Sequence, residues 1–327
     1  MGGTLMSKLK IGFYWASTCG GCEVAVLDVN EKILDTLKVA DIVFWPVAMD
    51  IKYKDIEAMG DKSVDICFFN GSIRNEENEH LAKLLRKKSR ILISFGSCAC
   101  GGGVPGLANL HNRRTVFEKV YRESVSTKNL PGVIPRTCSE AKEGELTLPE
   151  FYDTVKTLDQ VVNVDFYLPG CPPPVDLIAK VLQSFSSGTN PKKGSVLAPE
   201  ISLCESCKRE KGNKKIAKVK RFHETALDPK KCFLDQGIIC MGPATRSGCG
   251  EPCLDANMPC TGCMGPIPGA SDQGAAMIGA LSSILGIENE KEKSENDMDQ
   301  LVGEIKDPVG TFYKYTLPSS IINRRVK

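Results

Sequence analysis

The sequence predicts an α/β fold, with a doubly wound parallel sheet first and a loop-rich, cysteine-rich region after it. Apolar runs alternate with helical patterns as far as about residue 186. This alternation is typical of a parallel sheet covered by helices on both faces. Beyond residue 190 the periodicity gives way to polar loops, and eight of the 15 cysteines fall between Cys204 and Cys263. We therefore expect two differently built parts.

Five apolar runs are predicted as strands, and helical patterns connect several of them. The predicted strands are 10–16, 41–48, 64–70, 90–96 and 164–168. Apolar residues at helical spacing predict helices over 23–38, 76–88 and 175–186. Glu23 suits the first turn of the first helix, where a negative charge is favourable.

Cysteines follow three of the predicted strands directly. Cys19 and Cys22 follow the first strand, Cys98 follows the fourth and Cys171 follows the fifth. Ligands of open α/β sheets bind outside the carboxyl ends of the strands, so these loops are expected to converge. Four thiolates suit either a tetrahedral metal ion or a cubane cluster. A redox pair or a phosphate-binding loop is the alternative, but neither a dinucleotide fingerprint after the first strand nor a phosphate-loop motif is present.

The second region is defined by its cysteine spacing. It runs Cys204-x2-Cys207-x24-Cys232-x7-Cys240-x8-Cys249-x3-Cys253-x6-Cys260-x2-Cys263. Eight thiolates divide into two sites of four ligands, and zinc and iron–sulfur clusters both fit that number. Few large apolar residues are available here, so metal binding would supply folding energy. We expect a sheet domain over 1–190, a cysteine-rich domain over 191–285, and a polar linker with a C-terminal extension over 286–327.

Composition limits the function further. Lys and Arg number 42 against 40 Asp and Glu, and the net charge of +2 argues against a general nucleic-acid binder. No apolar run approaches the ~20 residues of a membrane span. Residues 1–10 show no export signal, which predicts a cytoplasmic protein. Thiols stay reduced there, which favours metal or redox chemistry over disulfides.

Five segments together resemble the small subunit of [NiFe]-hydrogenases, and the match runs from about residue 11 to 280. They are CGGCE (19–23), GSCACGGGVPGLAN (96–109), PGCPPP (169–174), CMGPATRSGC (240–249) and PCTGC (259–263). The resemblance implies a flavodoxin-like domain followed by an iron–sulfur cluster domain. It also implies three [4Fe–4S] clusters and no nickel, flavin or nucleotide in this chain.

The same resemblance implies how the cysteines are shared among the clusters. The implied proximal ligands are Cys19, Cys22, Cys98 and Cys171; the distal ligands are Cys204, Cys207, Cys232 and Cys240; the medial ligands are Cys249, Cys253, Cys260 and Cys263.

Two positions depart from the periplasmic members of the family. Cys204 stands where they have a histidine, and Cys253 stands where they have a proline. The fourth thiolate predicts a medial [4Fe–4S] cluster of lower potential in place of a three-iron one.

With these departures and no export signal, the chain resembles the cytoplasmic, methyl-viologen-reducing enzymes of methanogens, which do not reduce the deazaflavin coenzyme F420. That similarity implies a nickel–iron large subunit, an iron–sulfur delta subunit and heterodisulfide reductase as partners. Deazaflavin-reducing hydrogenases and sulfhydrogenases are close alternatives. A zinc-stabilised scaffold protein is the alternative from a different class. The resemblance implies that hydrogen is split at a nickel–iron site in another chain. No nucleophile–base pair is evident here, so this chain alone is expected to be inactive toward hydrogen.

The three remaining cysteines are expected to ligate nothing. Cys67 lies inside a predicted strand and is interpreted as a buried apolar filler. Cys100 competes with Cys98 for the proximal site, and we favour Cys98 because the family motif places the ligand directly after Gly-Ser. Cys138 has no partner at a ligand spacing.

Two charged stretches and an aromatic one lie outside these motifs. Residues 208–221 carry eight basic residues and one acidic one; we interpret them as a solvated loop, with docking of an acidic redox partner as the alternative. Residues 288–299 are predicted as a polar linker. Residues 308–317 are expected to pack on a partner.

Overall fold

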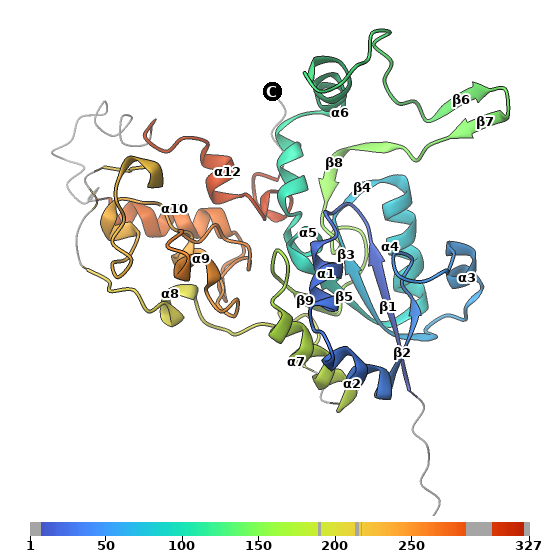
Figure 1. Ribbon diagram of the computed structural model, residues 1–327, viewed down its shortest axis with the longest axis horizontal. Coiled ribbons are helices and arrows are strands. Elements are labelled where there is room, and N and C mark those ends of the chain that lie inside the picture. The colour runs from blue at the N-terminus through green and yellow to red at the C-terminus, as the bar shows by residue number, and fades with distance from the viewer. Residues whose placement is uncertain (1–7, 189–190, 213–215, 217, 286–302, 324–327) are drawn as a thin grey trace, which may run out of the picture.

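The computed structural model describes residues 8–188, 191–212, 216, 218–285 and 303–323. A five-stranded parallel sheet lies in the first part of the chain (Figure 1), with strand order β2-β1-β3-β5-β9. Its strands are β1 (Leu9–Trp15), β2 (Ala40–Phe44), β3 (Val64–Asn70), β5 (Ser89–Phe95) and β9 (Phe166–Leu168). Numbered within this sheet alone, the order is 2-1-3-4-5, which is the flavodoxin-like order. The predicted doubly wound α/β fold is confirmed.

Helices cover both faces of this sheet. They are α1 (Gly21–Leu27), α2 (Lys32–Val39), α3 (Tyr53–Ala58), α4 (Glu76–Lys88), α5 (Gly96–Gly101) and α7 (Val175–Ser186). Side chains alternate along each strand, so Phe68 packs in the apolar cluster beneath α1 and α7, while Phe69 packs in the one beneath α3 and α4. Cys67 is fully buried in the second cluster, as expected for a filler.

The predicted helix 23–38 is wrong in one respect, because it is two helices. Asn30 lies between α1 and α2 with φ of 54°, and its side-chain Nδ2 donates to the carbonyl of Asp28 at 2.9 Å. Asparagine adopts this left-handed conformation more readily than most residues. The strand predicted over 41–48 ends at Phe44, where the chain turns and Ala48 N–H donates to the Trp45 carbonyl.

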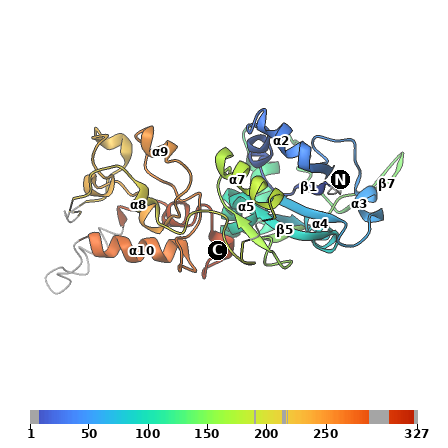
Figure 2. The ribbon, with the colours of Figure 1, turned by 90° about the horizontal axis from the view of Figure 1, so that it is seen from below.

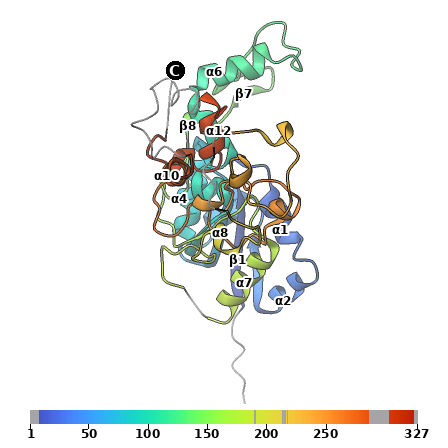
Figure 3. The same ribbon diagram turned by 90° about the vertical axis from the view of Figure 1, so that its left-hand side faces the viewer.

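Between β5 and β9 the chain forms an arm that the sequence periodicity did not predict. It contains a 3-10 helix (Val104–Leu110), α6 (Arg113–Glu118), a π-helical turn (Lys119–Glu123) and the hairpin of β6 (Cys138–Ala141) with β7 (Gly144–Thr147). The arm returns through β8 (Phe151–Lys156), which pairs antiparallel with β4 (Ile73–Asn75). Figures 1 and 3 show α6 and β7 projecting beyond the sheet.

The cysteine-rich part lies beside the sheet (Figure 2) and has its own apolar core. Its one longer helix is α10 (Gln273–Ile284), among the residues that the structure describes. The other helical elements are short: α8 (Leu203–Ser206), α9 (Pro252–Asp255), α12 (Pro308–Phe312), and 3-10 turns over Phe222–Glu224, Leu234–Gln236, Gly242–Ala244 and Leu317–Ser319. Phe233, Met277 and Leu281 are buried at its centre. In the described ranges, no helix is long and apolar enough to span a bilayer.

The C-terminal segment packs on this chain, which differs from the expected packing on a partner. Phe312, Tyr313 and Leu317 are buried in the core of the cysteine-rich part. The same segment reaches the sheet domain, where the Tyr315 carbonyl accepts from Gly103 N–H at 3.0 Å. The polar linker predicted over 288–299 lies outside the described residues.

Candidate metal centres

The cysteines after β1, β5 and β9 come together at the carboxyl edge of the sheet. Cys22 lies in the first turn of α1, and Cys98 lies in α5. Cys171 immediately precedes three prolines, and its peptide bond to Pro172 is cis. Burial raises the pKa of the Cys22 thiol, and the neighbouring Cys98, Cys171 and Cys19 raise it further. The convergence predicted from the strand ends is therefore present.

Burial also governs the other thiols at this edge. It raises the pKa of Cys98 to about 11, with charge repulsion from Cys171 and Cys19 added. It likewise raises the pKa of Cys171. Four thiolates gathered at one edge repel one another strongly. A bound cationic group would remove that repulsion, since metal ligation deprotonates thiols.

Two glycines bring the backbone directly against these thiols. A Cβ on Gly96 would lie 2.4 Å from Cys22 Sγ, and a Cβ on Gly103 would lie 2.5 Å from Cys98 Sγ. Both residues have positive φ, of 85° and 59°. We call this arrangement, in which the backbone of Gly96 and Gly103 lies directly against the thiols of Cys22 and Cys98, the cradle. It suits a cluster whose sulfurs accept hydrogen bonds from nearby backbone.

A second set of four thiols lies in the cysteine-rich part. Burial raises the pKa of Cys204 to about 12, and Cys240, Cys232 and Cys207 act on it in the same direction. The Lys211 ammonium opposes them, and its Nζ donates to the Cys204 carbonyl. Here too a glycine lies close: a Cβ on Gly242 would be 3.1 Å from Cys204 Sγ. The four cysteines of the expected distal set are neighbours.

The third set, expected to be medial, lies around α9. Burial raises the pKa of Cys263 to about 12, with added repulsion from Cys249 and Cys253. The pKa of Cys260 is raised by burial and by the charges of Cys240 and Cys263. The Gly262 N–H points at Cys260 Sγ from 3.4 Å. Backbone N–H groups of this kind stabilise thiolates and cluster sulfurs.

The three sets form a continuous series. Cys171 of the first set acts on Cys263 of the third, both through its charge and through a backbone hydrogen bond. Cys260 of the third set is in turn a neighbour of Cys240 of the second. The third set therefore lies between the other two in space, although it comes last in the sequence.

The donors in the three sets are thiols. In the described parts of the chain, no three His, Cys, Asp or Glu side chains are arranged to hold a metal ion. Four thiolates suit either a tetrahedral metal ion or a cubane cluster. The donor set, all thiols with backbone N–H groups around them, fits such clusters.

Three other residues were singled out in the sequence. Cys100 is close to the first set and acts on the Cys22 thiol; its Sγ is 3.3 Å from the Ser94 carbonyl, and burial raises its pKa to about 12. Cys138 is exposed at the start of β6. Glu23 is buried in the first turn of α1, and burial raises its carboxyl pKa to about 7.

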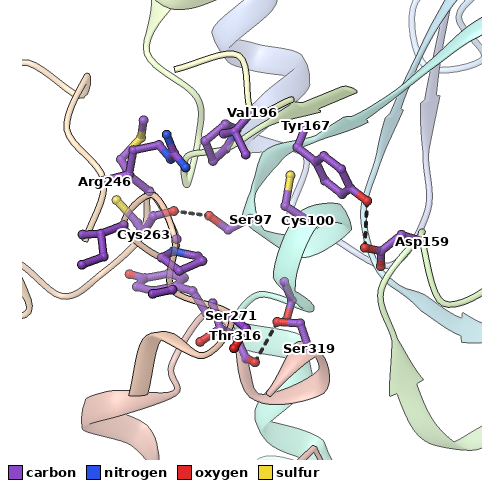
Figure 4. Close-up of a pocket in the computed structure, with 18 of the residues that line it drawn as sticks. Ser97, Cys100, Asp159, Tyr167, Val196, Arg246, Cys263, Ser271, Thr316 and Ser319 are labelled. Atoms are coloured by element: carbon purple, nitrogen blue, oxygen red, sulfur yellow. Dashed lines mark hydrogen bonds between the residues drawn. The ribbon is translucent and has the colours of Figure 1, made fainter. Parts of the chain in front are cut away.

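Sequence patterns missed the residues that join the two parts. Ser97 Oγ donates to the Cys263 carbonyl at 2.5 Å, linking α5 to the third set. Beside this bond is a cavity of about 350 Å³, lined by Ser97, Cys100, Arg246 and Cys263 among others (Figure 4). Arg246 and Arg209 are buried arginines of the cysteine-rich part. An arginine in a polar loop is usually exposed, and the sequence does not show that these two are buried. No sequence signal therefore marked Arg246 or Arg209.

Known proteins resemble this chain along most of its length. The family model described as "NADH ubiquinone oxidoreductase, 20 Kd subunit" matches residues 19–185. The iron–sulfur subunit of the F420-non-reducing hydrogenase of Archaeoglobus profundus is 44% identical over 97% of this chain and 99% of its own length. The corresponding subunit of the F420-non-reducing hydrogenase of Methanothermobacter marburgensis is 39% identical over 99% of both chains.

Among solved structures, one chain of an NAD+-reducing [NiFe]-hydrogenase in the H2-reduced state is 27% identical. It covers 57% of this chain and 94% of its own, with a TM-score of 0.48. The two F420-non-reducing hydrogenase subunits named above match this chain nearly end to end. The chain therefore belongs to the small-subunit family of [NiFe]-hydrogenases, alongside the matching subunits of the F420-non-reducing enzymes.

Proposed function

We propose that this chain is the electron-relay subunit of a cytoplasmic F420-non-reducing hydrogenase. Three [4Fe–4S] clusters, each held by four thiolates, would carry single electrons between the large subunit and the acceptor. The proximal cluster would be held by Cys19, Cys22, Cys98 and Cys171, the medial by Cys249, Cys253, Cys260 and Cys263, and the distal by Cys204, Cys207, Cys232 and Cys240.

One observation carries this proposal: the three thiol sets are linked in series. Ser97 Oγ, next to Cys98, donates to the Cys263 carbonyl, and Met241 N–H, next to Cys240, donates to the Cys260 carbonyl at 2.9 Å, which supports the order proximal, medial, distal. A storage or purely structural role needs no such series. Hydrogen bonding and burial by the chain also serve the relay, because they shield the thiols from water and fix them in position.

The proximal end carries apolar residues that a large subunit would cover. Val24 and Leu27 of α1 are 56% and 55% exposed, and Trp15, which stacks on Gly20 between the two loop cysteines, is 38% exposed. Apolar side chains gathered around a functional loop mark a protein interface. The nickel–iron subunit, in which hydrogen would be split, is the partner we assign to this end.

At the distal end exposed lysines lie close to the thiols. Lys208 and Lys230 line the same groove as Cys207, together with Glu210, Glu251 and Asp255, and Lys211 lies beside Cys204. Residues 208–221 carry eight basic residues and one acidic one, so an acceptor with an acidic surface would be attracted to this stretch. We propose the iron–sulfur delta subunit there, with heterodisulfide reductase as the enzyme that receives the electrons.

The test is metal and sulfide analysis of the complex after strictly anaerobic purification. We expect about 12 iron and 12 sulfide for each copy of this chain, after subtracting the iron of the partner subunits. Nickel should appear only when a larger chain co-purifies. About two zinc without sulfide would overturn the relay in favour of a zinc-stabilised scaffold. Hydrogen uptake by this chain alone would overturn the assignment of catalysis to a partner.

A further inference from the structure

We infer that Arg209 is a positioning residue that fixes the medial site against the distal site and places a buried positive charge between them. The inference rests on the proposed function, since it concerns the clusters that the two thiol sets would hold. Arg209 is two residues after Cys207, and only 9% of it is exposed.

The guanidinium group ties together loops of both sets. Its Nη1 donates to the Lys231 carbonyl at 3.1 Å, and Lys231 immediately precedes Cys232. Its Nη2 donates to the Leu254 carbonyl at 2.8 Å, and Leu254 immediately follows Cys253. One side chain thus holds the backbone next to a distal thiol and the backbone next to a medial thiol.

Further contacts lock this side chain in one orientation. Nη2 also donates to Asn257 Oδ1 at 2.9 Å, and Nη1 lies 3.3 Å from the Asp228 carbonyl. The guanidinium carbon is 4.0 Å from the centre of the Phe233 ring. A planar fork with several donors can satisfy all of these partners, whereas a lysine ammonium cannot reach both loops at once.

Arg209 makes no ion pair with a carboxylate in the described part of the chain, and its hydrogen bonds go to backbone carbonyls and an amide. The carboxylates of Glu210, Glu251 and Asp255 line the same groove without pairing with it there. A buried cation is costly unless negative groups compensate it. Four thiolates on each side, with the sulfides of a bound cluster, would add to the negative charge around it. The cation in turn favours the reduced, more negative form of a cluster and raises its reduction potential.

The experiment compares Arg209→Met with Arg209→Lys in the complete, anaerobically purified hydrogenase. Methionine removes both the charge and the donors, whereas lysine keeps the charge and loses the fork. Arg246→Met is the matched control. Arg246 is also buried, at 7% exposure, but its Nη1 donates to the Pro199 carbonyl and not to the loops that carry the distal cysteines. Potentials are measured by redox titration followed by EPR, and each signal is assigned from a cysteine variant of its own set.

We expect Arg209→Met to shift the medial and distal potentials to more negative values and to leave the proximal potential unchanged. Arg209→Lys should keep the potentials near wild type but lose iron to a chelator several-fold faster. The control should leave the distal potential at its wild-type value. An Arg209→Met complex with full iron and unchanged potentials, or with all three shifted equally, would overturn the charge role.

If Arg209→Met fails to assemble, Arg209→Lys still tests whether the guanidinium group holds the two loops together. A wild-type rate of iron loss in Arg209→Lys would overturn that positioning role. These outcomes differ from failure of the proposed function, which would show in the wild-type complex itself as missing iron, sulfide and cluster EPR signals.

Discussion

Gly96 packs its backbone directly against the thiol of Cys22, so closely that a Cβ at this position would lie 2.4 Å from Sγ. Gly96 opens α5 with φ of 85°, a conformation that residues with a side chain rarely adopt. The loop after β5 can therefore approach the loop after β1 only with glycine at this position. Cys98, two residues later, is placed by the same turn.

Gly96→Ala should empty the proximal site while leaving the other two intact. The added methyl must displace either the Cys22 thiol or the α5 backbone, and both changes disturb the ligand set. We expect about four iron fewer for each copy of this chain, with the medial and distal EPR signals retained. Gly60→Ala is the control, because nothing lies within 4 Å of a Cβ there. Full iron content in Gly96→Ala would contradict the cradle.

Replacing Cys98 and Cys100 separately will establish which thiol completes the proximal site. Cys98 is a neighbour of Cys171 and Cys19, whereas Cys100 Sγ is 3.3 Å from the Ser94 carbonyl inside its own domain. We expect Cys98→Ala to lose about four iron and Cys100→Ala to keep the full number. Iron analysis and EPR of both complexes check this, and the reverse pattern would assign the ligand to Cys100.

Asp165 anchors the sheet, and its ionisation predicts how stability depends on pH. Arg86 Nη1 lies 2.5 Å from its Oδ2, and Leu92 N–H donates to the same oxygen at 2.9 Å. Burial acts to raise the pKa of this carboxyl, but Arg86, Leu92 and Lys193 outweigh it, so the pKa is lowered. A lowered pKa means that the stabilisation is complete above the unfolded value of about 3.9 and is lost only as the pH falls below it.

Asp165→Asn should therefore lower the melting temperature by the same amount at every pH from 8 to 5. Breaking a fully buried pair from one side costs about 3–5 kcal/mol; Arg86 is partly exposed, so we expect a cost at or below the lower end of that range. Asp41→Asn is the control, since the Lys8–Asp41 pair is exposed and its loss should cost less than about 1 kcal/mol. A difference that shrinks between pH 8 and pH 5 would mean that the pKa of Asp165 is not lowered.

The parts of the fold set by local pattern could be predicted from the sequence, and those set by distant packing could not. β3, α4 and α7 have the predicted bounds, since apolar period and length decide them. The break at Asn30 depends on one backbone conformation, and β8 is a strand only because β4 lies beside it. Likewise, the sequence predicts that residues 308–317 pack on a partner, whereas this segment packs on the chain itself, where Gly101 and Gly102 of the sheet domain leave room for Thr316 and Pro318.

The site divides in the same way. Strand ends and cysteine spacing predicted which thiols would converge at the sheet edge, because parallel strands all end on one side. The order of the three sets could not be derived from spacing, since the set that comes last in the sequence lies in the middle. Nor could spacing mark Ser97 or Arg209, whose partners are backbone carbonyls far away in the chain.

Lys208→Glu, at the start of the basic stretch, combined with Lys230→Glu in the same groove, will test the two interpretations of that stretch. Both lysines are exposed in the groove that contains Cys207, which Glu210, Glu251 and Asp255 also line, so reversing two positive charges makes the potential at the proposed electron exit more negative. We expect the double variant to raise the KM for a dianionic acceptor, anthraquinone-2,6-disulfonate, several-fold at low salt. It should lower the KM for methyl viologen, which is a dication. Both changes should fade in ~0.5 M salt, because the Debye length is then only a few ångströms and the surface charges no longer act on a distant acceptor.

The control for this pair is Lys54→Glu, an exposed lysine of α3 on the sheet domain, which should change neither acceptor's KM. Opposite effects on the two acceptors separate electrostatics from a general loss of activity, since damage to a cluster would slow both. Association of the delta subunit with the double variant should also weaken as salt rises, and at lower salt than in wild type. Unchanged KM values and unchanged association would mean that residues 208–221 are a solvated loop and that electrons leave the chain at another place.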